Sequence, residues 1–197
     1  MGWNGVHVSQ LWRLAIQTGA WAIAAAWMLR AFEALRGMPS VPDLRMAEWE
    51  RPQVGLPSLT VVVPAKDEAE NIAASLDALL LADYRDRDGR PPIILAVDDR
   101  STAATGAILD DYAARFPERI EAIHVRELPE GWLGKTFALA AATEHSASRG
   151  QSDYLLFTDA DVLFSPSILR RALAYAETTE ADHLVVLPTM QIKAWGE

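Results

Sequence analysis

Apolar runs rich in β-branched residues alternate with amphipathic segments along most of the chain, and this alternation restricts the possible folds more than any other feature. The runs that predict strands span residues 59–63, 93–97, 120–125, 154–157 and 183–188. Between them, apolar residues recur at three- and four-residue spacing, which indicates amphipathic helices. Repeated alternation of this kind predicts βαβ units with right-handed crossovers. We therefore expect an α/β fold with a mostly parallel sheet and helices on both faces.

Side chains that cap helices well stand just before the predicted helices. Asp67 and Glu70 have the spacing of a capping box. A serine followed by proline typically supplies an N-cap and a first-turn residue. The expected helix starts are therefore Asp67, Ser101 or Thr102, and Ser165 with Pro166.

The N-terminal region contains a long uncharged apolar stretch. Residues 14–29 carry no charge and lie between Arg13 and Arg30. As a helix they rise about 24 Å, less than the roughly 30 Å of the hydrocarbon core, but flanking arginines and tryptophans extend such a fit. We expect a membrane-associated hydrophobic helix that spans the bilayer. The alternatives are an amphipathic helix on the membrane or on the domain, and a signal peptide, although no basic region precedes Arg13.

Proline and glycine interrupt every regular pattern between residues 37 and 57. A spanning helix would leave the following domain in the cytoplasm, at the inner or plasma membrane, because Arg30, Arg36 and Arg45 lie on that side. The expected organisation is a membrane-associated helix over 1–36, a proline-rich linker over 37–57 and a folded domain over 58–197.

Charge and cysteine content exclude several classes of function. The chain holds 27 acidic and 18 basic residues, for a formal net charge of −9, and no cysteine. We expect no nucleic-acid partner, because phosphate backbones are bound by clustered lysine and arginine. Without cysteine there are no disulfides, thiolate zinc sites or cysteine nucleophiles.

The fourth predicted strand ends in two carboxylates. Its sequence, YLLFTDAD, separates Asp159 and Asp161 by one residue. Side chains two apart at a strand end point the same way, and their repulsion of about 2 kcal/mol is relieved by a cation. Mg²⁺ or Mn²⁺ accepts one or two carboxylates together with substrate phosphates. For a DxD sequence by itself, solvated turn residues are the alternative.

Acidic residues also follow other predicted strands. In parallel sheets the carboxyl ends of the strands meet at one edge, where ligands bind. Residues 64–68, 98–100 and 159–161 follow three of the strands, and a loop ending GWLGKT follows the remaining one of the first four. This joint placement predicts a site where carboxylates bond a base and ribose, a divalent ion lies on the last acidic pair, and Lys135 offsets a diphosphate.

Four ordered motifs carry a family resemblance: VVVPAKDEAENI, AVDDRST, GWLGKTFAL and LLFTDAD. Over about residues 58–190 the chain resembles the nucleotide-sugar-binding half of family 2 glycosyltransferases, which have the Rossmann-like GT-A fold. The LPEGWLGKTFAL loop is most similar to membrane-associated members that act on lipids, particularly hopanoid-associated and carotenoid glycosyltransferases. The resemblance implies inverting, metal-dependent transfer of a sugar from a nucleotide-diphosphate sugar to a lipid-type acceptor, such as a hopanoid.

The resemblance also implies roles for individual residues. Asp99 would bond the base with support from Asp98. Lys66 stands where many relatives carry an aromatic residue, so base stacking is not expected there. The implied nucleotide-sugar-binding residues are Pro64, Ala65, Lys66, Glu68, Asp98, Asp99, Lys135 and Asp159. The implied ligands of Mn²⁺ or Mg²⁺ are Asp159 and Asp161.

Members of this family usually take their catalytic base from an acidic residue downstream of the DxD sequence, in the acceptor-binding half. No such motif follows before Glu197. We therefore expect the base to lie beyond Glu197 and this chain to be a donor-binding portion truncated at its C-terminus.

A P-loop NTPase and a non-catalytic, membrane-tethered scaffold of the same fold are the alternative functions. Residues 134–136, GKT, resemble the end of a P-loop. However, Pro129 stands where that motif needs its first glycine, and proline has no N–H for a phosphate. The loop also follows the third predicted strand, whereas a P-loop usually follows the first.

Overall fold

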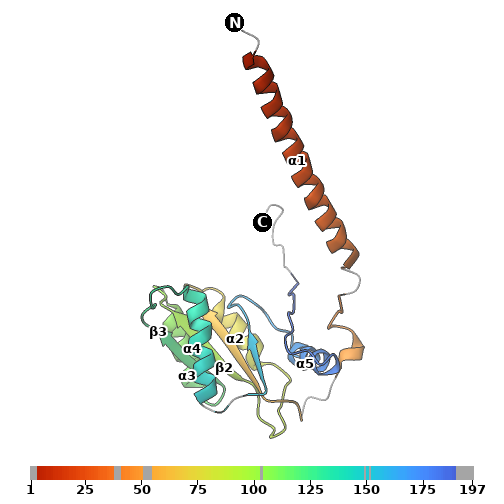
Figure 1. Ribbon diagram of the computed structural model, residues 1–197. Helices are drawn as coiled ribbons and strands as arrows, with labels where there is room; N and C mark the ends of the chain where they lie inside the picture. The colour runs from red at the N-terminus through yellow and green to blue at the C-terminus, as the bar shows by residue number, and fades with distance from the viewer. Residues whose placement is uncertain are drawn as a thin grey trace. The chain divides into compact units, whose positions relative to one another are not determined.

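The computed structural model describes residues 4–37, 41–50, 55–102, 104–148, 150 and 152–189. The chain divides into two compact units, Met1–Asp43 and Leu44–Glu197. The first contains the single helix α1 (Asn4–Gly37), and the second contains the other elements (Figure 1). Pro39 and Pro52 of the expected linker lie outside the described residues, and the expected boundaries near residues 36 and 57 stay predictions.

The helix α1 is continuous and carries large exposed apolar side chains along its length. Trp12, Trp21 and Trp27 are 68%, 76% and 73% exposed. Among the described residues, however, no helix combines the length and the apolar character that crossing a bilayer requires. The span expected at residues 14–29 is therefore not found. The stretch is rich in alanine, which is only weakly hydrophobic, and it includes the polar residues Gln17 and Thr18. Its mean hydropathy is therefore low for a membrane span.

Four parallel strands form one sheet in the described part of the second unit, in the order β3-β2-β1-β4. In register, Val61 pairs with Ile94 on one side and with Leu156 on the other. The predicted parallel α/β fold and its first four strands are confirmed. The strands are β1 (Leu59–Ala65), β2 (Ile93–Asp99), β3 (Ile120–Val125) and β4 (Tyr154–Phe157).

The fifth predicted strand, at residues 183–188, is wrong. These residues are described, and they form no strand. Val185 and Leu187 are 66% and 78% exposed. An apolar, β-branched run favours a strand only when a neighbouring strand pairs with its backbone. In the described residues β4 pairs with β1 alone, so this segment has no strand beside it.

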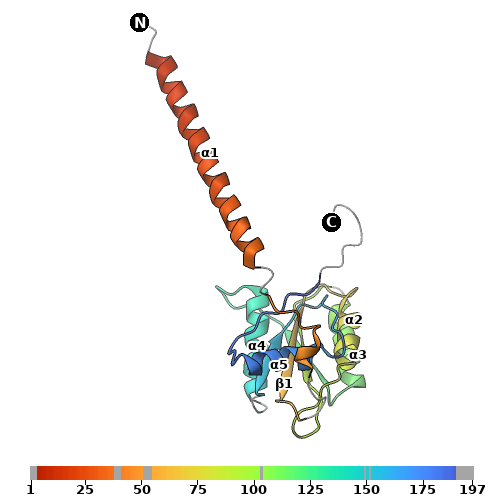
Figure 2. The ribbon, with the colours of Figure 1, turned by 90° about the vertical axis from the view of Figure 1, so that its right-hand side faces the viewer.

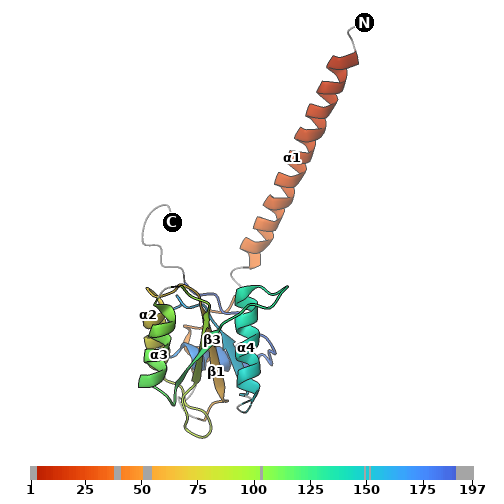
Figure 3. The same cartoon turned by 90° about the vertical axis from the view of Figure 1, so that its left-hand side faces the viewer.

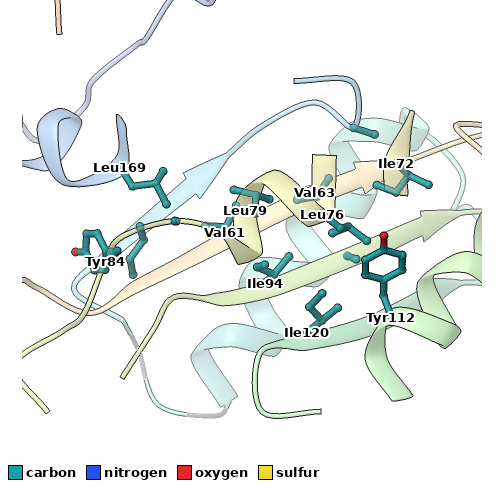
Figure 4. Close-up of a cluster of buried hydrophobic side chains, with 14 of the residues drawn as sticks. Val61, Val63, Ile72, Leu76, Leu79, Tyr84, Ile94, Tyr112, Ile120 and Leu169 are labelled. Atoms are coloured by element: carbon teal, nitrogen blue, oxygen red, sulfur yellow. The ribbon is translucent and has the colours of Figure 1, made fainter. Parts of the chain in front are cut away.

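Helices cover both faces of the sheet, as predicted. Figures 2 and 3 show α4 on one side and α2 with α3 on the other. Leu76 of α2, Tyr112 of α3 and Leu169 of α5 belong to one buried cluster with alternate strand residues such as Val61 (Figure 4). Ala138 of α4 packs in a second cluster on the opposite face. The helices are α2 (Ile72–Leu80), α3 (Thr105–Arg115), α4 (Gly134–Ser148) and α5 (Ile168–Thr178).

The expected helix caps are wrong in position. The residues that precede α2, α3 and α5 are Asn71, Ala104 and Ser167, and none makes a side-chain capping bond. Two of the predicted caps, Asp67 and Thr102, instead join the loops that follow β1 and β2. Asp67 accepts hydrogen bonds from Thr102, and the carbonyl of Pro166 accepts one from Asp83.

A short 3₁₀ helix, η2 (Ala47–Trp49), packs against α5. The rings of Trp49 and Tyr175 meet edge to face with centroids 4.9 Å apart. Glu50 forms ion pairs with Arg170 and Arg171 of α5. These contacts hold the start of the second unit on the side of the sheet that α5 covers.

Candidate functional site

A cavity of about 400 Å³ lies at the carboxyl edge of the sheet. The ends of β1, β2 and β4 and the start of α4 surround it. Strand order reverses between β1 and β4, and ligands in open α/β sheets bind at such a switch point. The lining residues are Pro64, Ala65, Lys66, Glu68, Asp99, Arg100, Gly134, Lys135, Asp159, Ala160 and Asp161.

Hydrogen bonds join the two loops that follow β1 and β2. Asp67 Oδ1 accepts bonds from the backbone N–H and the hydroxyl of Thr102, at 2.8 and 3.0 Å. The backbone N–H of Asp67 donates to Ser101 Oγ at 3.1 Å. Asp67 has a left-handed backbone, with φ of +55°. Its neighbours Lys66 and Glu68 line the cavity, so these bonds fix one wall of it.

Asp99 and Arg100 form an ion pair in the cavity wall. The Asp99 side chain is only 6% exposed. Arg100 donates from Nε to Asp99 Oδ1 at 2.8 Å, and its Nη2 lies 2.8 Å from the same oxygen. A Cβ on Gly134 would come within 2.6 Å of Arg100 Nη2 and closer still to Asp99 Oδ2. The first residue of α4 is therefore a glycine against which the ion pair packs.

Asp98 points away from this ion pair toward β3 and α3. Its Oδ1 accepts the backbone N–H of Ser101 at 3.0 Å. The His124 imidazole lies between Asp98 Oδ2, at 3.2 Å, and Asp110 Oδ1, at 2.8 Å. Burial acts to raise the pKa of Asp98, but the bonds to Ser101 and His124 outweigh it and hold the pKa below its usual value. The bond to Asp110 raises the pKa of His124 against the opposing effect of burial.

Asp159 and Asp161 line the side of the cavity that follows β4. Both are exposed, and Lys135 Nζ forms an ion pair with Asp159 Oδ1. Because Lys135 is the second residue of α4, its ammonium and the helix N-terminus add positive charge on the same side. This part of the cavity therefore combines two carboxylates with a cation and backbone N–H groups.

The two carboxylates suit a hard cation whose other coordination positions are filled by a bound substrate and water. No cluster of three or more potential metal-binding side chains occurs within the described ranges. Mg²⁺ and Mn²⁺ are commonly held by one or two carboxylates, with substrate phosphates and water supplying the other oxygens. Asp159 and Asp161 are the residues that could hold such an ion.

The structure brings together every predicted site residue except Asp98, which is absent from the cavity lining. Asp98 instead contacts His124 of β3, a residue for which the sequence predicted only a place in the strand 120–125. The lining also includes Arg100, Gly134 and Ala160, which were not predicted as site residues. All three stand inside the motifs that follow the strands, and that position was the signal that could have identified them.

Most of the chain is similar to known proteins. The profile of the family described as Glycosyl transferase family 2 matches residues 60–196. The chain is 26% identical over 159 residues to a beta-monoglucosyldiacylglycerol synthase of Synechocystis sp., covering 80% of this chain and 31% of that protein. It is 26% identical over 121 residues to a Bacillus subtilis protein named as glycosyltransferase EpsE, covering 61% and 39%.

A solved structure gives a similar result. The chain is similar to a mannosyltransferase from Pyrobaculum calidifontis in complex with GDP-Man and Mn²⁺, with a TM-score of 0.57 and 26% identity. The likeness covers 83% of this chain and 43% of that one. The chain thus spans roughly a third of the length of the two curated relatives, at 31% and 39%.

Proposed function

The chain belongs to glycosyl transferase family 2, and we propose that its cavity binds a nucleotide-diphosphate sugar and a divalent metal ion for sugar transfer. The observation that carries this proposal is the cavity itself. A volume of about 400 Å³ suits a small-molecule ligand, and its wall combines Lys135 with Asp159 and Asp161. The mannosyltransferase of similar fold binds GDP-Man and Mn²⁺, which supports the same donor class here.

The proposed arrangement follows the charges along the cavity wall. The nucleoside lies beside the ends of β1 and β2, near Lys66, Glu68 and the Asp99–Arg100 pair. The diphosphate lies beside the start of α4, where Lys135 and the helix N-terminus offset its charge. Asp159 and Asp161 hold Mn²⁺ or Mg²⁺ next to the diphosphate.

The proposed reaction is a single displacement with inversion. An acceptor hydroxyl attacks the anomeric carbon, the bond from that carbon to the diphosphate oxygen breaks, and the hydroxyl proton passes to a general base. When bound, the metal ion neutralises charge on the departing diphosphate. Lys135 contributes to the same effect from the protein, because its ammonium lines the cavity beside Asp159, where we propose the diphosphate to bind.

Substitution of Asp161 tests the metal and donor assignment. We expect Asp161→Asn to abolish the Mn²⁺-dependent part of nucleotide-sugar binding, because a neutral amide is a poor ligand for a hard cation. Isothermal titration of UDP-glucose and GDP-mannose, each with Mn²⁺ and with EDTA, measures this dependence. Asp182→Asn, at an exposed aspartate outside the cavity lining, is the matched control. Equal Mn²⁺-dependent affinity in both variants would refute the assignment.

Binding and turnover measurements distinguish the proposed function from the two alternatives, a P-loop-like NTPase and a non-catalytic scaffold. Tight binding of ATP in preference to the nucleotide sugars would favour a P-loop-like NTPase. The non-catalytic scaffold predicts donor binding without turnover. Release of nucleoside diphosphate from the donor, measured with and without acceptor, therefore distinguishes an enzyme from a scaffold.

We propose a lipid-type acceptor, such as a diacylglycerol or a hopanoid. Trp132 and Leu133 directly precede the cavity residues Gly134 and Lys135, and they are 43% and 76% exposed. The Trp132 ring packs edge to face on Phe137, which holds it in place. The Synechocystis relative is named for the synthesis of a glucosyl diacylglycerol. An apolar rim beside a polar cavity suits an acceptor with a hydroxyl head and an apolar body.

Equilibrium binding of acceptors in mixed micelles tests the acceptor class. We expect the chain to bind a lipid acceptor in preference to a water-soluble sugar. Leu133→Ser should weaken binding of the lipid acceptor while leaving donor binding unchanged. Leu81→Ser, at another exposed leucine, is the control because Leu81 is 71% exposed and does not line the cavity.

We also propose that the chain works at the cytoplasmic face of the inner or plasma membrane through surface contact. The exposed tryptophans of α1 suit the interfacial region of a bilayer. Flotation of the full chain with lipid vesicles tests this proposal. A double variant, Trp21→Ser with Trp27→Ser, should float less, and equal flotation of the two proteins would contradict it.

A further inference from the structure

Arg100 has an unusual backbone conformation for its residue type. Three non-glycine residues in the described part of the chain have positive φ: Asp67 (+55°), Arg100 (+56°) and Glu180 (+52°). Aspartate tolerates this region because its short side chain bonds locally, as Asp67 does with Thr102. Glu180 follows the last turn of α5, where helices commonly end in this conformation. Arg100 has neither explanation, and strain of this kind concentrates at binding sites.

The Arg100 guanidinium is held from two sides. Its Nε and Nη2 both contact Asp99 Oδ1, and Asp99 is almost fully buried. Nη2 also packs against Gly134, where a Cβ would lie only 2.6 Å away. The side chain lines the cavity and remains 28% exposed. The ion pair therefore presents a fixed guanidinium whose Nη1 hydrogens have no protein partner among the described residues.

The charge of this pair indicates what kind of ligand atom it suits. Because Asp99 offsets the positive charge of Arg100, the pair offers directional N–H donors with little net charge. The negative charge of a diphosphate is better neutralised by Lys135 and by the proposed metal ion, on the other side of the cavity. A neutral carbonyl oxygen is the matching partner for a charge-compensated guanidinium. Uracil, thymine, cytosine and guanine carry carbonyl oxygens, and adenine carries none.

We propose that Arg100 binds a carbonyl oxygen of the donor's nucleobase, so that the site selects nucleotides whose base carries a carbonyl oxygen, such as uracil or guanine, over adenine nucleotides. The proposal rests on the proposed function of the cavity as a donor site. It adds a specificity-determining residue and narrows the donor class. It also changes the expected role of Asp99, whose carboxylate positions Arg100.

Nucleotide titrations of the full chain test this inference. The probes are UDP, GDP and ADP with Mn²⁺, and the variants are Arg100→Gln and Arg100→Lys. The lysine variant keeps a positive charge beside Asp99 but lacks the planar fork. Arg115→Gln is the matched control, because Arg115 also pairs with an aspartate, Asp111 at 3.1 Å, and lies outside the cavity lining. Thermal unfolding verifies that each variant is folded.

We expect the unchanged chain to bind UDP or GDP at least about tenfold more tightly than ADP, the factor that one charge-assisted hydrogen bond supplies. Both Arg100 variants should lose most of this discrimination, and Arg115→Gln should keep it. An equal loss of affinity for all three nucleotides would overturn the inference, since Arg100 would then act on the shared diphosphate or on the fold. Retained discrimination in both Arg100 variants would overturn it too.

The two proposals fail in different ways. If the unchanged chain binds none of the nucleotides, the donor site itself is refuted, and the role of Arg100 falls with it. If the unchanged chain binds UDP, GDP and ADP equally well, the donor site stands and only base recognition by Arg100 is refuted.

Discussion

Replacing Gly134 with alanine measures how closely the start of α4 fits the Asp99–Arg100 ion pair. The added Cβ would lie 2.6 Å from Arg100 Nη2, well inside the 3.4 Å at which ordinary contact begins, and it would meet Asp99 Oδ2 as well. Alanine favours a helix over glycine by at most about 1 kcal/mol. The steric conflict costs about 1–3 kcal/mol, and separating a nearly buried carboxylate from its arginine adds to this. We therefore expect a net loss of about 2 kcal/mol.

Urea unfolding followed by circular dichroism gives this free energy, and UDP and GDP titrations give the effect on binding. We expect Gly134→Ala to unfold at lower urea and to bind nucleotide more weakly. Gly19→Ala is the matched control, because Gly19 also lies in a helix and its added Cβ would meet no atom within 4 Å apart from its chain neighbours and the backbone of its own helix. Unfolding of Gly134→Ala at the same urea concentration as the unchanged chain, with intact nucleotide binding, would refute the reasoning.

Two further substitutions test other contacts. Tyr84→Phe should destabilise the fold by about 1–2 kcal/mol in urea unfolding, because the buried Tyr84 hydroxyl donates to the carbonyl of Pro57 at 2.6 Å. His124→Gln should flatten the fall in stability above neutral pH. The raised pKa of His124 means that its protonated contacts with Asp98 and Asp110 stabilise the fold fully below about pH 6.5, and that this stabilisation, on the order of 1 kcal/mol, disappears as pH rises through the folded pKa. An unchanged pH profile between pH 6 and 9 would contradict this second prediction.

Local patterns located the strands and the edge of the sheet where the cavity lies. The first four strands lie where short apolar runs predicted them, because a run of four to seven apolar residues suits a strand buried on both faces. The order of strands and helices then implied a parallel sheet, which brings the ends of β1, β2 and β4 to one edge. Residues directly after the strands were therefore good candidates for the cavity wall.

The same patterns were misleading where a residue's partner lies far along the chain. Asp67 has the spacing of a helix cap, but it bonds Thr102, 35 residues away. Residues 183–188 have the composition of a strand, but no strand lies beside them in the described residues. Capping and strand propensities describe what a segment can do, and competing tertiary contacts decide which of these options is used.

The amino-acid sequence by itself determined the α/β fold and the set of charged residues at one edge of its sheet, because both depend on spacings of two to four residues. Only the tertiary structure decided which partner each of these charged residues contacts. It directs Asp98 to His124, 26 residues away, and packs the Asp99–Arg100 pair on Gly134. It also leaves Asp159 and Asp161 exposed beside Lys135. These contacts depend on which strand ends lie next to the start of α4 around the cavity. Spacings of a few residues along the sequence do not determine that arrangement.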